Sequence, residues 1–185
     1  MIDDTKRTFI ATAAAGLEGL CKRELLHLGF EDARAELGGV RFTADFARAF
    51  QACLWLSCAD RVLLVMAEGE CRSFEELFQM VKRAPFSQVL PRDAAIPVSG
   101  RCARSQLMSV RDCQAITKKA IVEHMQSAFH THTLPETGPR YQVDVALHND
   151  IARVTIDLCG DALAQLVEEL IFELVDALAG RQQLI

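Results

Sequence analysis

The chain has 185 residues, 50% of them hydrophobic and 24% charged, which is typical of a globular protein with a sizeable core. Its 25 acidic residues outnumber its 20 lysines and arginines, so nucleic-acid binding by bulk charge is excluded and would need a local basic patch. Seven cysteines, without a Cys-x-x-Cys pair, predict reduced thiols of a cytoplasmic protein. Residues 1–16 have the pattern of neither a signal peptide nor a membrane span.

The first part of the chain alternates strand and helix patterns. The expected elements are a strand, a helix, two strands, a helix and a strand, over residues 7–14, 16–29, 33–37, 40–44, 45–55 and 61–66. Gly38 and Gly39 join the two central strands as a hairpin, and Asp45 caps the second helix. Trp55 on that helix is expected in the core. This order of elements is that of a ferredoxin-like domain.

A second unit begins at Ser73, which has Glu76 three residues later and so predicts a capping box. The helix that follows is expected to end near Arg83. The later elements are a strand, a loop, a long helix and a hairpin, over residues 94–99, 101–108, 109–130, 141–147 and 151–158. Pro97 interrupts the first of these strands and predicts an edge position or a bulge.

The most basic stretch of the chain lies between residues 101 and 119, with Asp112 as its only acid. Ser109 followed by Asp112 predicts a helix N-cap, and the N-terminus of a helix favours phosphate. Arg111 and Lys118 would lie on nearly one helical face, about 10.5 Å apart, a spacing that suits two phosphates of one strand. We therefore expect an RNA-binding site made of Arg101, Arg104, Ser105, Gln106, Arg111, Gln114, Lys118, Lys119 and Arg140.

These candidates differ in rank. Arg104, Arg111 and Lys118 come first. Lys119 points about 100° away from Lys118 around the helix axis. Ser105 and Gln106 have an equally good interpretation as residues that cap the loop. A solvated helix face is the alternative for the whole stretch. Few aromatic residues lie nearby, so we expect recognition of structured RNA by its backbone and shape instead of base stacking.

The last part of the chain, residues 163–185, predicts an amphipathic helix. Apolar residues recur at intervals of three and four between Leu163 and Leu178, and acidic residues lie off that stripe. One interpretation is a cover for a sheet face of the same chain. The other is an adapter that forms a homodimer or docks on a partner, such as a methyltransferase domain, through residues 163–178.

Five segments together carry a resemblance to a known family. They are FIATAAAGLEGLCKRELLHLGF, GGVRFTADFARAFQACLWLSCADRVLL, CRSFEELFQMVK, SQLMSVRDCQAITKKAIVEHM and GPRYQVDVALHNDIARVTIDLCGDAL. In this order and spacing, over about residues 7–163, the chain resembles the N-terminal half of bacterial THUMP-containing 23S rRNA guanine-N2 methyltransferases. The resemblance implies an α+β chain with a ferredoxin-like domain (1–70), a THUMP domain (71–162) and the C-terminal helix (163–185).

The resemblance also implies a function. In this family the THUMP region recognises RNA, here in the first place ribosomal RNA, and a domain that binds S-adenosylmethionine follows it. No glycine-rich cofactor loop and no Asn-Pro-Pro-Tyr-type motif occurs in the sequence, so we expect no catalytic, cofactor-binding or metal-binding residues. An independent enzyme with a metal at His130, His132 and Glu136 is the weaker alternative. The chain then fits either a part of a methyltransferase or a stand-alone RNA-binding protein.

Overall fold

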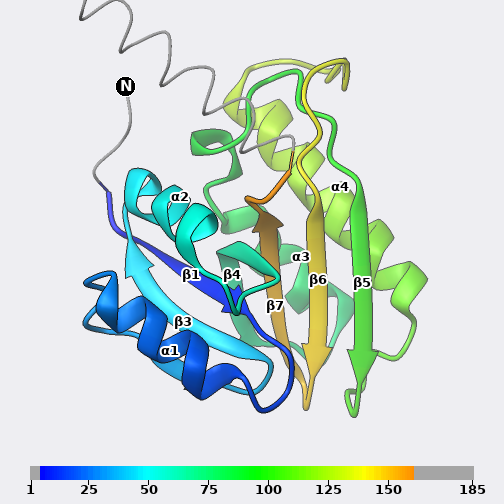
Figure 1. The fold of residues 1–185 in the computed structure, drawn as a ribbon. Coiled ribbons are helices and arrows are strands. Elements are labelled where there is room, and N and C mark those ends of the chain that lie inside the picture. The colour runs from blue at the N-terminus through cyan, green and yellow to red at the C-terminus, as the bar shows by residue number, and fades with distance from the viewer. Residues whose placement is uncertain (1–4, 161–185) are drawn as a thin grey trace, which may run out of the picture.

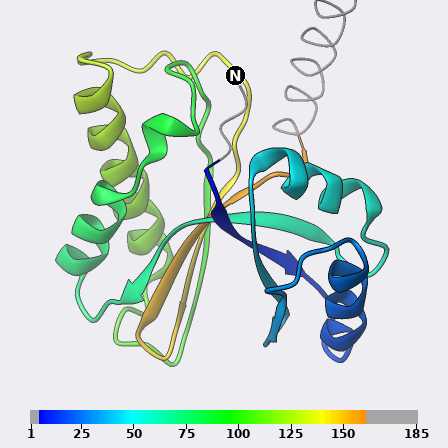
Figure 2. The same cartoon turned by 90° about the vertical axis from the view of Figure 1, so that its left-hand side faces the viewer.

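The computed structural model describes residues 5–160 as one twisted sheet with helices packed against both of its halves (Figures 1 and 2). The seven strands lie in the order β2-β3-β1-β4-β7-β6-β5. The strands are β1 (Arg7–Thr12), β2 (Arg34–Glu36), β3 (Gly39–Ala44), β4 (Arg61–Glu70), β5 (Val98–Ala103), β6 (Val143–His148) and β7 (Ile151–Asp157). The helices are α1 (Glu18–His27), α2 (Phe46–Trp55), α3 (Phe74–Arg83), the 3₁₀ turn η1 (Phe86–Gln88) and α4 (Val110–Ala128).

The first six elements form the expected ferredoxin-like unit. Its sheet order is β2-β3-β1-β4, with all neighbours antiparallel. Local signals explain the turns, because Gly38 has φ of 80° and a Cβ on Gly39 would meet the Ala11 carbonyl oxygen at 2.6 Å. The Asp45 carboxylate caps α2 by accepting the Arg48 N–H at 2.8 Å.

Strand β4 joins this unit to the next one. Residues 61–64 pair with β1, and residues 63–70 pair with β7, so the two units share one sheet. The register with β7 shifts between Val65 and Ala67, which marks a bulge. The expected strand over 61–66 is therefore confirmed and continues for four residues more.

The second unit has its own helices and a parallel edge strand. The Ser73–Glu76 capping box is present and opens α3. Strand β5 runs parallel to β6 at the edge of the sheet. It begins after Pro97, whereas the sequence predicted a strand over 94–99. Residues 94–97 instead form a connecting segment with one isolated bridge between Ala95 and Arg140, because Pro97 has no N–H for a ladder.

One face of the sheet is buried and the other is polar. A row of directly paired residues crosses it under the helices: Phe42, Phe9, Leu64, Ile156 and Val143, each at most 1% exposed. Alternate residues of the same strands point to the opposite face. In Figure 1 that opposite face of β5, β6 and β7 is turned to the viewer, with α3 and α4 behind it.

The expected core position of Trp55 was wrong. This side chain is 67% exposed. In α2 the buried face is formed by Ala49, Phe50 and Ala52, and Trp55 is the last residue of the helix. Trp55 therefore lies beyond the buried face of α2 and does not pack against the sheet, although it is apolar.

Residues 161–185 lie outside the described part, and with them the predicted helix over 163–178 and its docking role. Among the helices of residues 5–160, none is long and apolar enough to cross a membrane.

Candidate nucleic-acid interface

Hydrogen bonds hold the connection from β5 to α4, and the side chain of Arg104 takes part in none of them. The Ser105 hydroxyl donates to the Ala103 carbonyl at 3.1 Å and accepts the Asp150 N–H at 3.0 Å. The Asp150 carboxylate accepts the Gln106 N–H at 2.7 Å. Arg104 has a left-handed backbone with φ of 51° and is exposed. The side chain of Ser105 is thus used to shape the loop, which was the alternative interpretation of this residue.

Helix α4 begins six residues after Arg104 and carries a second exposed arginine in its first turn. The Ser109 hydroxyl accepts the Asp112 N–H at 3.4 Å, as an N-cap does, and Arg111 lies in the first turn. Among residues 5–160, neither the Arg104 nor the Arg111 guanidinium has an ion-pair or hydrogen-bond partner. The N–H groups of the first turn add positive potential at the same end. We call Arg104, Arg111 and the loop between them the α4 N-terminal surface.

Lys118 does not extend this surface, in contrast to the expectation from its spacing. Its ammonium group donates to the Ile96 carbonyl at 2.9 Å and lies 2.7 Å from the Glu136 carboxylate. It therefore connects α4 to two irregular segments of the same unit. The interval of seven residues from Arg111 predicts a shared helical face, but it does not show which loops cover that face.

The two remaining candidates on α4 have different surroundings. Lys119 is exposed, with its ammonium 5.5 Å from the centre of the Phe78 ring and 3.9 Å from Glu123. Gln114 is half-buried and packs against β5, where a Cβ on Gly100 would meet its Cγ at 3.1 Å. Neither side chain joins the α4 N-terminal surface.

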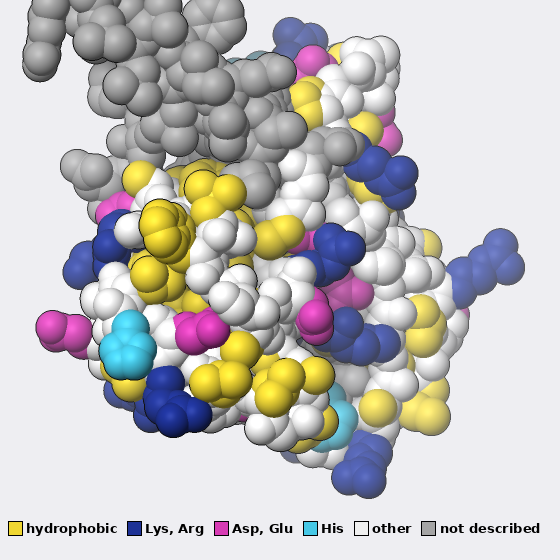
Figure 3. Space-filling view, in the orientation of Figure 1, with side chains coloured by type: hydrophobic (Ala, Val, Ile, Leu, Met, Phe, Trp, Pro, Cys, Tyr) yellow, Lys and Arg dark blue, Asp and Glu magenta, His cyan; other side chains and the backbone are white. Residues whose placement is uncertain are grey.

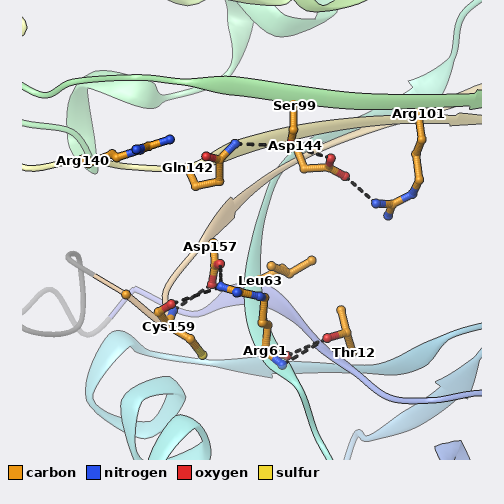
Figure 4. Close-up of a pocket in the computed structure, with 11 residues that line it drawn as sticks. Thr12, Arg61, Leu63, Ser99, Arg101, Arg140, Gln142, Asp144, Asp157 and Cys159 are labelled. Carbon is orange, nitrogen blue, oxygen red and sulfur yellow. Dashed lines mark hydrogen bonds and ion pairs between the residues drawn. The ribbon is translucent and has the colours of Figure 1, made fainter. Parts of the chain in front are cut away.

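Arg101 and Arg140 lie elsewhere, on the open face of the sheet. Strand β5 includes Arg101, which the sequence had placed in the loop. Both arginines line a pocket of about 450 Å³ with Arg61, at the junction of the two units (Figure 4). We call it the sheet-face pocket. The predicted set of basic residues is therefore divided between two surfaces.

Two of the three arginines in the sheet-face pocket already face a carboxylate. Arg101 lies 2.9 Å from Asp144, and Arg61 pairs with Asp157. Arg140 has no ion-pair partner among residues 5–160. In Figure 3 basic side chains lie along the right-hand part of this face, with acidic ones among them. An anion in the pocket would thus compete with two existing ion pairs.

Arg61 is a pocket residue that the sequence did not suggest. It opens β4 and belongs to the first unit, 40 residues before Arg101. The only available signal is alternation, since Val62 and Leu64 are buried and Arg61 and Leu63 point to the other face. That pattern gives the face but no partner.

A third group of charges on the open face is internally balanced. Arg41 and Arg153 each bridge Glu36 and Glu68, with nitrogen–oxygen distances between 2.7 and 3.2 Å. Partial burial raises the pKa of Glu68, but the bonds and charges of Arg153 and Arg41 outweigh it and hold that pKa below its usual value. We call these four residues the closed network.

Within residues 5–160, the first strand–helix loop and the potential metal ligands show no arrangement for a nucleotide or a metal ion. The first strand–helix connection contains Gly16, but the Glu18 carboxylate accepts the N–H groups of Gly16 at 2.7 Å and Gly38 at 3.2 Å. The carboxylate of Glu18 thus occupies the backbone N–H groups that a nucleotide phosphate would need. Among residues 5–160, no group of three or more His, Cys, Asp or Glu side chains is arranged for a metal ion.

These features define an α+β protein in which a ferredoxin-like unit and a second unit share one sheet. The RlmL ferredoxin-like domain matches residues 8–63, and the THUMP domain, an RNA-binding domain, matches residues 71–157. The chain belongs to the family that carries these two domains, as found in the N-terminal part of THUMP-containing RNA methyltransferases.

Relatives extend over nearly the whole described part. The putative RNA methyltransferase YpsC of Bacillus subtilis is 38% identical over 85% of this chain and 41% of its own length. The ribosomal RNA large subunit methyltransferase K/L of Aeromonas hydrophila is 28% identical over 86% of this chain and 22% of its own length. The crystal structure of SMU.472, a putative methyltransferase complexed with SAH, has a TM-score of 0.80 and 38% identity over 84% of this chain and 42% of that chain. The chain thus spans less than half the length of these relatives.

Proposed function

We propose that this chain is the RNA-recognising part of an S-adenosylmethionine-dependent RNA methyltransferase, with N2 of a guanine in ribosomal RNA as the methylated position. The THUMP domain and the relatives named as RNA and ribosomal RNA methyltransferases support this proposal. In this view the chain binds the RNA, and the methyl transfer belongs to a domain that residues 5–160 do not contain.

The observation that carries the proposal is the α4 N-terminal surface. Arg104 and Arg111 are exposed and lack ion-pair partners among residues 5–160; Arg111 lies in the first turn of α4, at its positive end, and Arg104 lies in the loop that leads to it. A guanidinium without a carboxylate partner can bind phosphate bidentately. The Ser105–Asp150 bonds fix the loop between β5 and α4, so little order has to be gained on binding.

We assign the first phosphate contacts to this surface rather than to the sheet-face pocket. Arg101 and Arg61 would each have to share their guanidinium with Asp144 or Asp157, and the carboxylates repel phosphate. Arg140 is the one pocket arginine without such a partner in the described part. Each arginine of the sheet-face pocket therefore contributes less to RNA affinity than each arginine of the α4 N-terminal surface.

Three double variants test this assignment by titration of a structured ribosomal RNA fragment at fixed salt. Arg104→Ala with Arg111→Ala should weaken binding by about tenfold or more, since two phosphate contacts are lost. Arg101→Ala with Arg140→Ala should weaken it less. Arg23→Ala with Arg34→Ala is the control, because it removes the same charge from exposed positions of the ferredoxin-like unit. Equal losses in all three variants would leave only a general charge effect and contradict the proposal.

A further inference from the structure

Two cysteines from distant parts of the chain meet beside the sheet-face pocket. Cys53 lies on α2 of the ferredoxin-like unit, and Cys159 follows β7 of the THUMP unit, 106 residues later. Their sulfur atoms are 3.6 Å apart. Both side chains are half-buried, and neither takes part in the proposed RNA contacts.

The surroundings of Cys159 favour its thiolate. The thiol of Cys53 is the first cause that lowers the pKa of Cys159, to about 7, and the Val62 N–H, which reaches its sulfur at 3.2 Å, acts in the same direction. Burial and the charge of Asp157 oppose this shift, and Arg61 supports it. The hydrogen bond with Cys159, and then burial, raises the pKa of Cys53, which therefore keeps its proton.

Cys159 is accessible in part. It is half-buried and borders the sheet-face pocket, where it lies beside Asp157 and Arg61 in Figure 4. A small oxidant can therefore approach this half-buried residue, and the Cys53 sulfur lies next to its thiol. Reactive cysteines have this combination of accessibility and a lowered pKa.

A second pair of cysteines in the same chain has similar spacing but different surroundings. The sulfur atoms of Cys102 and Cys113 are 3.8 Å apart, on β5 and α4. Cys113 is 0% exposed, and burial raises its pKa to about 12. At neutral pH about one thiol in two is ionised at a pKa of 7, but only about one in 10⁵ at a pKa of 12. Cys159 is thus far more readily ionised than Cys113, although the two pairs have nearly the same sulfur–sulfur distance.

We infer that Cys159 and Cys53 form an oxidisable thiol pair, which a peroxide converts to a disulfide between the two units. The Cys159 thiolate attacks one oxygen of hydrogen peroxide, the O–O bond breaks, and Cys159 becomes a sulfenic acid while hydroxide leaves. The sulfur of Cys53 then attacks the sulfenic sulfur, an S–S bond forms, and the S–O bond breaks. The departing hydroxide takes the proton of Cys53, so two thiols and one peroxide give one disulfide and two waters.

The bond would fasten α2 to the residue that follows β7. It would hold Cys159, at the wall of the sheet-face pocket, against α2. The end of the THUMP unit would thus be fixed to the ferredoxin-like unit. This inference does not depend on RNA binding, since the pair would oxidise whether or not the chain binds RNA.

Treatment of the full chain with hydrogen peroxide at pH 7, followed by intact-mass measurement and peptide mapping, tests the inference. The Cys53–Cys159 link should appear at least about tenfold faster than a Cys102–Cys113 link, and dithiothreitol should remove it. In the Cys53→Ser variant, Cys159 should stop at the sulfenic acid, which dimedone traps. In the Cys159→Ser variant, neither product should form at Cys53.

The mapping of the unmodified protein decides the question even if a variant fails to fold. Equal oxidation of both pairs, a link between other cysteines, or the absence of the Cys53–Cys159 link while peroxide is consumed at other cysteines would overturn the inference. So would a failure of dimedone to label Cys159 in a folded Cys53→Ser variant. None of these results would bear on the proposed RNA contacts.

Discussion

The closed network and the α4 N-terminal surface each contain two arginines, but they differ in the carboxylates that face them. Arg41 and Arg153 share Glu36 and Glu68, so the four charges cancel within the sheet face. Arg104 and Arg111 have no such partners among residues 5–160. An arginine that joins strands thus differs from one that is available to a ligand in its carboxylate partners, not in the number of basic residues around it.

The sheet-face pocket lies between these two extremes. Arg101 and Arg61 each have one carboxylate partner, and Arg140 has none in the described part. An acidic chain with a net charge of −5 can bind RNA only where such imbalances occur locally.

The largest change in stability is expected from the closed network. Arg153→Ala removes bonds to Glu36 and Glu68 and leaves both carboxylates with one partner fewer, which should cost about 2 kcal/mol of unfolding free energy. RNA affinity should not change. Urea denaturation measures the loss, with Arg104→Ala as the control, whose effect should stay within about 0.5 kcal/mol. Similar losses in both variants would remove the distinction between the two groups.

Lys118 is expected to contribute to stability and not to RNA binding, as the arginines of the closed network do, although it lies in the basic stretch. Lys118→Met keeps most of the apolar stem but removes the bond to the Ile96 carbonyl and the ion pair with Glu136. The unfolding free energy should fall by about 1 kcal/mol. RNA affinity should change by less than about twofold. A tenfold loss of affinity with unchanged stability would restore Lys118 as a phosphate ligand.

Ser109 connects the two properties, because it caps the helix that carries Arg111. Ser109→Ala should lower the unfolding free energy by about 1 kcal/mol. It should also weaken RNA binding slightly, since the first turn frays. The Ser109→Asp variant is the comparison: it keeps the cap but adds a negative charge, so it should preserve stability and weaken RNA binding further. An Asp variant that binds RNA as well as the original chain would argue against phosphate at this position.

The smallest effect is a pH dependence of the closed network. The pKa of Glu68 is lower in the folded chain than its usual value of 4.5, so the unfolded chain binds more protons in that range. The stabilisation is complete above about pH 4.5 and is lost as pH falls through the folded pKa. Glu68→Gln should therefore flatten the fall in stability on acidification, measured by urea midpoints from about pH 6 to about pH 3. An unchanged slope in this variant would contradict the assignment.

Local signals in the sequence predicted most elements of the fold. The hairpin at Gly38, the caps Asp45 and Ser73, and the alternation of β6 and β7 all depend on neighbouring residues, and all are present. Strand β5 lies at the edge of the sheet, which was one of the two positions predicted for the strand near Pro97, although β5 begins only after that residue. The colinear resemblance then supplied the arrangement of the two domains.

The site was harder to predict because its geometry depends on residues far apart in the chain. The sequence placed Arg101 in a loop, but strand pairing with β6 continues past it and turns it to the sheet-face pocket. It made Lys118 a free ligand, but Glu136 on a later loop pairs with it. Trp55 looked like a core residue, yet no element covers the end of α2 in the described part. In each case the outcome depends on residues that are far away in the chain, either because they pair with the side chain or because none of the described ones covers it.

The salt dependence of RNA binding tests the central claim most directly. The logarithm of the affinity should fall linearly with the logarithm of salt concentration, and the Arg104→Ala/Arg111→Ala variant should lose about 0.9 of the slope for each duplex phosphate contact that disappears, about 1.8 in total. The Arg41→Ala/Arg153→Ala variant, where it is folded, should keep the original slope. An unchanged slope in the first variant, or an equal reduction in both, would contradict the account that two arginines near the start of α4, without carboxylate partners in the described part of the chain, hold the RNA.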